Sequence, residues 1–157
     1  MRIEKILKEI EELIIDQEYS IAEKYLLRLM NKNPEHPEVH YSLGDVYCKL
    51  RKFDLAIDQE SIANQILPGN PQILDLLGWA YFMNGNITLG RKYIQQALEL
   101  NPDDIRLLCD MIVLEIHAQN KIALDYSYKA LKLYPNDSMV QEVSSMALRM
   151  FNRIRKN

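Results

Sequence analysis

The sequence predicts an all-α protein built from repeated pairs of antiparallel helices. Three observations support this fold class. Apolar residues recur with the 3.6-residue period of a helix, Gly and Pro stand between the periodic segments, and the whole pattern repeats every 34 residues. The 157 residues are enough for one ordinary domain.

The unit at 71–104 is the most complete. Its first half places Leu74, Leu77, Gly78 and Tyr81 on one helix face. Asn84-Gly85-Asn86 ends that helix, because Gly and Asn tolerate the left-handed conformation. The second half aligns Ile87, Gly90, Ile94, Ala97 and Leu98, and Asn101-Pro102 ends it. Gly78 and Gly90 stand at facing positions, so the two helices can approach closely.

This unit resembles a tetratricopeptide repeat (TPR), whose first helix carries an aromatic residue, Leu, Gly and Tyr, and whose second carries Ala, an aromatic residue, Ala and then Pro. The matching residues are Leu74, Leu77, Gly78, Tyr81, Gly90, Ile94, Ala97 and Pro102. The resemblance implies a right-handed α-solenoid with about four repeats and a C-terminal capping helix. The whole chain, 1–157, would then be a single TPR domain.

The preceding unit, 37–70, is nearly as clear. Its matching residues are Leu43, Gly44, Tyr47, Phe53, Ala56, Ala63 and Pro68. It departs from the family at His40, where an aromatic residue is usual, and at Glu60, where a large apolar residue is usual. Both substitutions bear on local packing and leave the repeat in place.

The first unit, 3–36, is regular only in its second half. Tyr19, Ala22, Leu29 and Pro34 support a helix over about 19–32. The first helix has an apolar stripe at Ile3, Ile6, Ile10, Leu13 and Ile14, whereas strict register puts Glu9 in the core. This helix is therefore either rotated relative to its counterparts or a solvated N-terminal cap.

The fourth unit, 105–137, is degenerate and one residue shorter, with the deletion in or near Gln119-Asn120-Lys121. It keeps Leu108, Met111, Ile112, Ala123, Ala130 and Pro135, and Glu115 replaces the template tyrosine.

A capping helix is expected over about 138–156, with Ser138 or Asp137 as its N-cap. Its apolar stripe is Val140, Val143, Met146, Ala147, Met150, Phe151 and Ile154. Its end carries Arg149, Arg153, Arg155 and Lys156, cations that suit a helix C-terminus. The alternative is that this cluster contacts a membrane or nucleic acid.

Composition and motifs exclude several classes of function. The net charge is −3, with no basic stripe in the body of the chain, which disfavours nucleic-acid binding. We find no signal peptide, no membrane-spanning run and no common catalytic motif, and so expect no enzyme activity, cofactor or membrane insertion.

The two cysteines, Cys48 and Cys109, lack metal-ligand spacing and indicate a reducing, cytoplasmic location. His36 and His40 are four apart, but Pro37 favours a helix start between them, so we expect no metal site.

The resemblance also implies which residues line the concave groove: the second, fifth, ninth, twelfth and thirteenth of each first helix. In the second, third and fourth units these are Glu38, Tyr41, Asp45, Cys48, Lys49, Gln72, Asp75, Trp79, Phe82, Met83, Arg106, Cys109, Val113, Ile116 and His117. In the first unit they are Glu4, Leu7, Glu11, Ile14 and Ile15.

The residues themselves draw attention to the third unit. Trp79, Phe82 and Met83 cannot all be buried by their own helix, because another face already forms its core. They either meet a ligand or pack against a neighbouring repeat or the C-terminal helix.

The charges of the expected groove indicate the chemistry of its ligand. Glu38, Asp45 and Asp75 disfavour a clamp for a terminal carboxylate. An apolar floor with acidic flanks favours an amphipathic helix or extended segment with apolar anchors beside Lys or Arg.

The predicted function is therefore a non-enzymatic protein-binding module, an adaptor, chaperone or assembly factor whose partner is another protein. The alternative is a self-associating scaffold, a homo-oligomer in which a terminal helix, 1–16 or 138–156, fills a neighbouring groove. RNA binding is disfavoured by the 34-residue spacing and the acidic groove.

Overall fold

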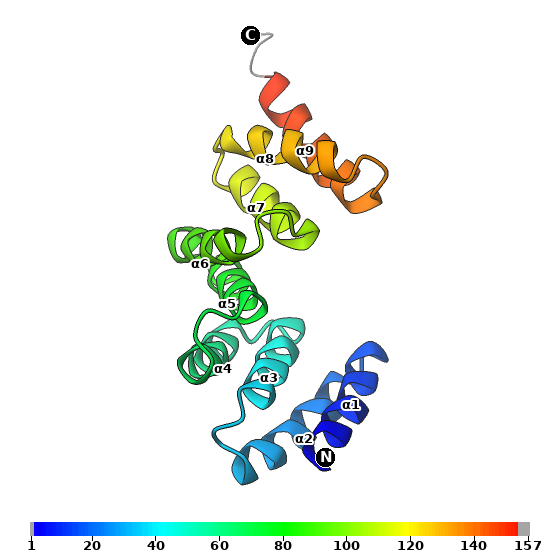
Figure 1. Cartoon of the computed structure of the whole chain (residues 1–157), viewed down its shortest axis with the longest axis vertical. Helices are drawn as coiled ribbons and strands as arrows, with labels where there is room; N and C mark the ends of the chain where they lie inside the picture. Colours follow the sequence, from blue (N-terminus) through cyan, green and yellow to red (C-terminus); the bar gives the residue numbers. More distant parts are fainter. Residues whose placement is uncertain (1, 154–157) are drawn as a thin grey trace.

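The computed structural model describes residues 2–153, with the side chains of 2–152, and forms nine α-helices in that range (Figure 1). They are α1 (Arg2–Ile15), α2 (Tyr19–Lys32), α3 (Pro37–Lys49), α4 (Phe53–Ile66), α5 (Pro71–Met83), α6 (Ile87–Leu100), α7 (Ile105–His117), α8 (Ile122–Leu133) and α9 (Ser138–Arg153). Residues 154–156 of the expected capping helix lie outside the described residues.

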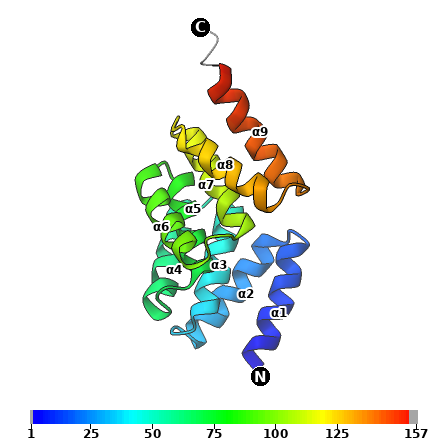
Figure 2. The same ribbon diagram turned by 45° about the horizontal axis from the view of Figure 1, so that its top comes forward.

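Each helix packs on the next, so that four antiparallel pairs follow one another and α9 closes the far end against α7 and α8 (Figures 1 and 2). No strand occurs between residues 2 and 153. The predicted all-α solenoid is thereby confirmed. None of the helices in this range is long and apolar enough to cross a membrane.

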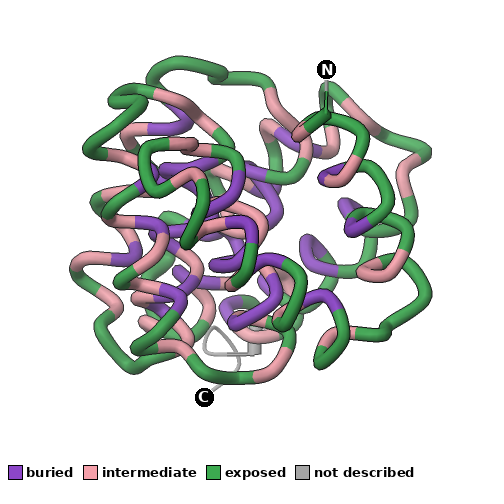
Figure 3. Tube along the Cα trace, turned by 90° about the horizontal axis from the view of Figure 1, so that it is seen from below, coloured by how far each residue is buried: buried purple, intermediate pink, exposed green. Residues whose placement is uncertain are grey.

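The core consists of two clusters that meet near α5. One gathers buried residues of α1 to α4, and the other joins α5 to α9. Figure 3 shows the buried segments on the sides of the helices that face one another. In α9 the buried side chains are Val140, Val143, Ser144, Ala147 and Phe151. Met146, which we expected in this stripe, is 39% exposed. The N-cap of α9 is Asp137, whose carboxylate accepts a 3.0 Å hydrogen bond from the Val140 N–H.

The predicted close approach of α5 and α6 is present at Gly78 and Gly90. A Cβ atom at Gly78 would lie 2.7 Å from Cγ1 of Ile94 and 2.9 Å from the Gly90 carbonyl oxygen. One at Gly90 would lie 2.9 Å from Cβ of Phe82. Neither position has room for any side chain, so these glycines fix the spacing of the pair.

A residue in the left-handed backbone conformation follows the first helix of every pair. Positive φ angles of 62°, 59°, 90° and 53° occur at Gln17, Arg51, Gly85 and Gln119, which are 34 residues apart. Only one of the four is Gly, the residue that adopts this conformation without steric cost. Beyond Gln119 the fourth unit shortens, and α8 has 12 residues where α6 has 14.

Glu60 occupies, in the second pair, the place that Ile94 occupies in the third. It is fully buried against Gly44, where a Cβ atom would lie 2.0 Å from Glu60 Oε1. Neither carboxyl oxygen has a hydrogen-bond partner among the described residues. Burial, and secondarily the charge of Asp45, raise the pKa of Glu60 well above its usual range. Burial thus favours the neutral form of the Glu60 carboxyl over its carboxylate.

The other two polar residues that depart from the family pattern, His40 and Glu115, have hydrogen-bond partners. The ring nitrogens of buried His40 lie 2.8 Å from Gln59 Oε1 and 2.7 Å from the Pro34 carbonyl oxygen. Buried Glu115 accepts two hydrogen bonds from Arg91, from Nε at 2.5 Å and from Nη2 at 2.9 Å. This bidentate pair joins α6 to α7 and so links the third unit to the fourth.

We predict that Glu60→Ile raises the free energy of unfolding at pH 7 by about 1–3 kcal/mol, because an apolar side chain removes the cost of a buried carboxyl. The raised pKa means that the wild type loses stability as pH rises from about 4 through the folded-state pKa of Glu60. Urea unfolding between pH 4 and pH 9 measures both effects. Glu60→Gln is the control, because it keeps the shape of the side chain but does not titrate. It should flatten the pH dependence of the unfolding free energy and give only part of the increase expected for Glu60→Ile. If the unfolding free energy of both variants falls with pH as steeply as that of the wild type, this account is wrong.

We further predict that Arg91→Ala lowers the free energy of unfolding by about 3 kcal/mol, because it leaves the Glu115 carboxylate buried without a partner. The double variant Arg91→Met with Glu115→Leu should recover most of that loss. Thermal and urea unfolding of both variants measure the difference. Additive losses in the double variant would show that the ion pair is not what stabilises this junction.

Candidate binding groove

Two adjoining cavities lie along the first helices of the pairs. α1, α3 and α5 line a cavity of about 730 Å³, and α3, α5 and α7 line a second one of about 260 Å³. Asp45 and Lys49 line both, so the two form one continuous groove. Its position is the one implied by the resemblance for the concave side of the repeats.

The larger cavity exists because α1 stands apart from α3. The successive first helices α3, α5 and α7 pack against one another, whereas α1 is held by α2 and has no comparable packing on α3 within the described chain (Figure 1). Ile15, at the end of α1, is 71% exposed on this side. The first unit is therefore attached to the stack mainly through the contact of α2 with α3.

Many of the expected residues do meet in these cavities. The larger one is lined by Glu38, Tyr41, Asp45, Lys49 and Gln72 and by all five residues expected from the first unit, Glu4, Leu7, Glu11, Ile14 and Ile15. The smaller one is lined by Asp45, Cys48, Lys49, Asp75, Trp79 and Arg106. Glu9, which strict register would bury, is exposed, and Ile10 takes the core position of α1.

The sixth residue of each first helix also lines the cavities, although the family pattern did not include it. Lys8 and Ser42 line the larger cavity, and Leu76 and Asp110 line the smaller one. Helical spacing could have predicted this, because the sixth residue lies four residues after the second and three before the ninth and so shares their helix face.

Six expected residues line neither cavity. Phe82, at 8% exposure, and Cys109, at 2%, are buried in the core. The Phe82 ring lies 5.3 Å from that of Trp79 and 5.2 Å from that of His117. Of the two alternatives left open for Phe82, the structure therefore agrees with packing against the neighbouring repeat, because α7 covers it. Met83, Val113 and Ile116 pack partly buried on the same cluster, and exposed His117 faces the Val113 carbonyl oxygen through Nδ1 at 2.9 Å.

Ion pairs remove much of the acidity that the sequence suggested for the smaller cavity. Asp75 is 2% exposed and pairs with Arg106, so it cannot serve as a free acidic flank. Asp45 pairs with Lys49 at 3.1 Å. Burial and the neighbouring Asp75 carboxylate raise the pKa of Asp110 to about 8, so near neutral pH Asp110 is protonated.

The acidic excess lies instead in the larger cavity. Its lining carries four carboxyl side chains, Glu4, Glu11, Glu38 and Asp45, and two lysines, Lys8 and Lys49. Between them lie the apolar surfaces of Leu7, Ile14, Ile15 and Tyr41.

The two cysteines expected in the groove are poor nucleophiles at neutral pH. Burial raises the pKa of Cys48 to about 12 and that of Cys109 to about 11, so both thiols stay protonated at neutral pH. No cluster of His, Cys, Asp or Glu suited to a metal ion occurs among residues 2–152.

We predict that Asp110→Asn weakens the pH dependence of stability. The folded-state pKa of about 8 exceeds the unfolded value of about 3.9, so protonation of Asp110 stabilises the wild type at low pH, and this stabilisation disappears as pH rises through 8. Asn keeps a donor facing Asp75 but does not titrate. Urea unfolding between pH 5 and pH 9 should show the difference between wild type and variant changing with pH; parallel profiles would contradict it.

Comparisons with known proteins agree with this architecture. Residues 71–104 match the family described as "Tetratricopeptide repeat". The anaphase-promoting complex subunit 6 of Dictyostelium discoideum is 35% identical over 63 residues, which are 40% of this chain and 7% of that protein. The chain thus matches only a small part of that relative.

Solved structures share the fold at low sequence identity. The Cut9 structure from the APC/C hetero-tetramer Cut9-Hcn1 has a TM-score of 0.83 and 18% identity over 91% of this chain and 29% of its own. PilF of Pseudomonas aeruginosa has a TM-score of 0.83 and 16% identity, covering 96% and 69%. MamA of Desulfovibrio magneticus has a TM-score of 0.78 and 20% identity, covering 86% and 77%.

Proposed function

Because the chain is a tetratricopeptide-repeat protein, whose fold is a generic protein-interaction module, we propose that it holds a peptide or amphipathic helix of another protein in its concave groove. It would act as an adaptor, chaperone or assembly factor. The observation that carries the proposal is the cavity of about 730 Å³ between α1 and α3, with its apolar floor and acidic rim.

The lining of this cavity selects the chemistry of the partner. Leu7, Ile14 and Tyr41 offer apolar surface for Leu, Ile or Phe anchors. Glu11 and Glu38 stand beside it, and neither forms an ion pair within the described residues. A segment carrying Lys or Arg next to its apolar side chains complements both features.

Insertion of a terminal helix of another copy is the weaker alternative. The apolar face of α9 is already buried on α7 and α8 of its own chain, and α1 packs Ile10 into the core with α2. Neither helix is free to leave without exposing that surface. Among similar structures, Cut9 forms a hetero-tetramer with Hcn1, which is an assembly with another protein.

We predict that Ile15→Glu reduces partner capture about tenfold while leaving helicity and the melting temperature unchanged, since Ile15 is 71% exposed. Ile15 is a cleaner probe than Trp79, which packs against the core. The matched control is Leu55→Glu, at a site of 43% exposure on α4, outside both cavities.

Partner capture is measured by photo-crosslinking with benzoylphenylalanine at Tyr41, in the cavity, and at Tyr128, which is 57% exposed on α8. A protein crosslinked in cell lysate from position 41 and not from 128, and lost in Ile15→Glu, supports the proposal. Crosslinks only to a second copy of the chain would establish self-association, and identical products at both positions would refute groove binding.

A further inference from the structure

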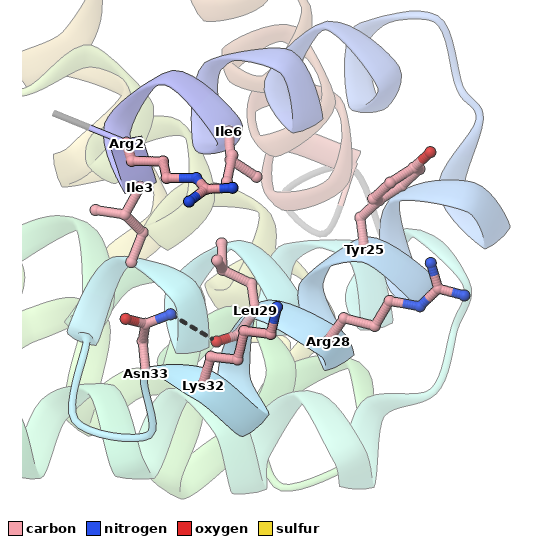
Figure 4. A pocket seen from close by; sticks show the side chains of 8 residues that line it. All are labelled: Arg2, Ile3, Ile6, Tyr25, Arg28, Leu29, Lys32 and Asn33. Atoms are coloured by element: carbon pink, nitrogen blue, oxygen red, sulfur yellow. Dashed lines mark hydrogen bonds between the residues drawn. The ribbon is translucent and has the colours of Figure 1, made fainter.

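A further cavity lies at the α1 end of the described solenoid, outside the concave groove. There α1 and α2 enclose a space of about 360 Å³, which we call the edge cavity (Figure 4).

The floor of this edge cavity is apolar. Ile3 and Ile6 project from α1 and Leu29 from α2, with the ring of Tyr25 at one side (Figure 4). Tyr25 is 50% exposed, so part of this apolar surface is open to solvent. The α2 end beneath it is fixed, because Asn33 Nδ2 donates a 3.0 Å hydrogen bond to the Leu29 carbonyl oxygen.

All the charged residues that line the edge cavity are basic. Arg2 stands on the α1 side and Arg28 and Lys32 on the α2 side, and no acidic residue lines the cavity. None of these three cations forms an ion pair with another described residue. Three unpaired cations therefore surround an apolar floor, whereas the lining of the concave groove on the other side of α1 has an excess of acids.

We propose that the edge cavity between α1 and α2 docks an acidic amphipathic helix of another protein. One or two Leu or Phe side chains of the partner enter between Ile3, Ile6 and Leu29, which the cavity of about 360 Å³ can accommodate. Asp and Glu side chains beside them pair with Arg2, Arg28 and Lys32. The site is separate from the concave groove and does not depend on the function proposed for it.

The apolar floor distinguishes this partner from a simple polyanion. A nucleic acid or a phosphate would engage the three cations and leave Ile3 and Ile6 unused. A helix that presents apolar side chains between acids uses both parts of the site.

The test uses a fluorescein-labelled synthetic 16-residue helix with Leu spaced three and four apart and Glu at the exposed positions, together with a counterpart in which Lys replaces every Glu. We expect the full chain to bind the Glu peptide, more weakly at high salt. Arg28→Glu with Lys32→Glu should reduce that affinity about tenfold or more, because two attractive pairs become repulsive. Fluorescence anisotropy measures binding, and circular dichroism confirms that helicity is kept.

A matched control changes charge equally at the other end of the molecule. Lys132→Glu with Arg149→Glu alters two exposed cations of α8 and α9 and should leave binding of the Glu peptide unchanged. Ile15→Glu should also leave it unchanged while weakening any binding of the Lys peptide in the concave groove, so failure at one site is distinguishable from failure at the other.

Three outcomes would overturn the proposal. The first is no binding of the Glu peptide, or equal loss in the control variant. The second is binding of phosphatidylserine vesicles that requires Arg28 and Lys32 without binding of the peptide, which would identify a membrane contact. The third is a concentration-dependent mass that the Arg28→Glu, Lys32→Glu variant abolishes, which would identify a second copy as the occupant.

Discussion

The close approach of the two helices within a pair is the constraint on which the rest of the stack depends. At Gly78 the backbone of α6 and the side chain of Ile94 fill the space that a side chain on α5 would need. One side chain from the second helix therefore lies directly on the first, and this contact sets which residues of the first helix point toward the concave side. Gly44 has the same geometry in the second pair. The α4 side chain that packs on it, Glu60, is therefore fully buried.

Carboxyl groups enter the interior of this protein in three different ways. Glu60 has no hydrogen-bond partner among the described residues and its pKa is raised by burial. Glu115 accepts two hydrogen bonds from Arg91, and Asp75 contacts Arg106 on one side and Asp110 on the other. The last two arrangements connect one repeat to the next. Polar contacts thus orient one helix pair relative to the next, whereas small residues set the approach of the two helices within a pair.

The repeat pattern was sufficient to predict the fold, because helix period, turn residues and the 34-residue spacing are local properties of the chain. It also predicted the facing glycines and the cavity residues of α1. It failed for Phe82 and Cys109, since periodicity gives the face on which a residue lies but not whether a neighbouring helix covers that face. The separation of α1 from α3 was likewise not predictable, because it depends on packing between units rather than on a pattern within one.

The separation of α1 from α3 also has a thermodynamic consequence. In a linear array of repeats, each unit is stabilised by its own contacts and by its junctions with its neighbours, and here α2 makes most of the junction of the first unit with α3. The contact of α1 with α2 is also less extensive than that of α3 with α4 or of α5 with α6, so we expect the first unit to have a lower local opening free energy than the units around α5 and faster exchange of its amide hydrogens. A partner seated between α1 and α3 would supply the missing half of that junction, so occupancy of the groove and order of the first hairpin rise together.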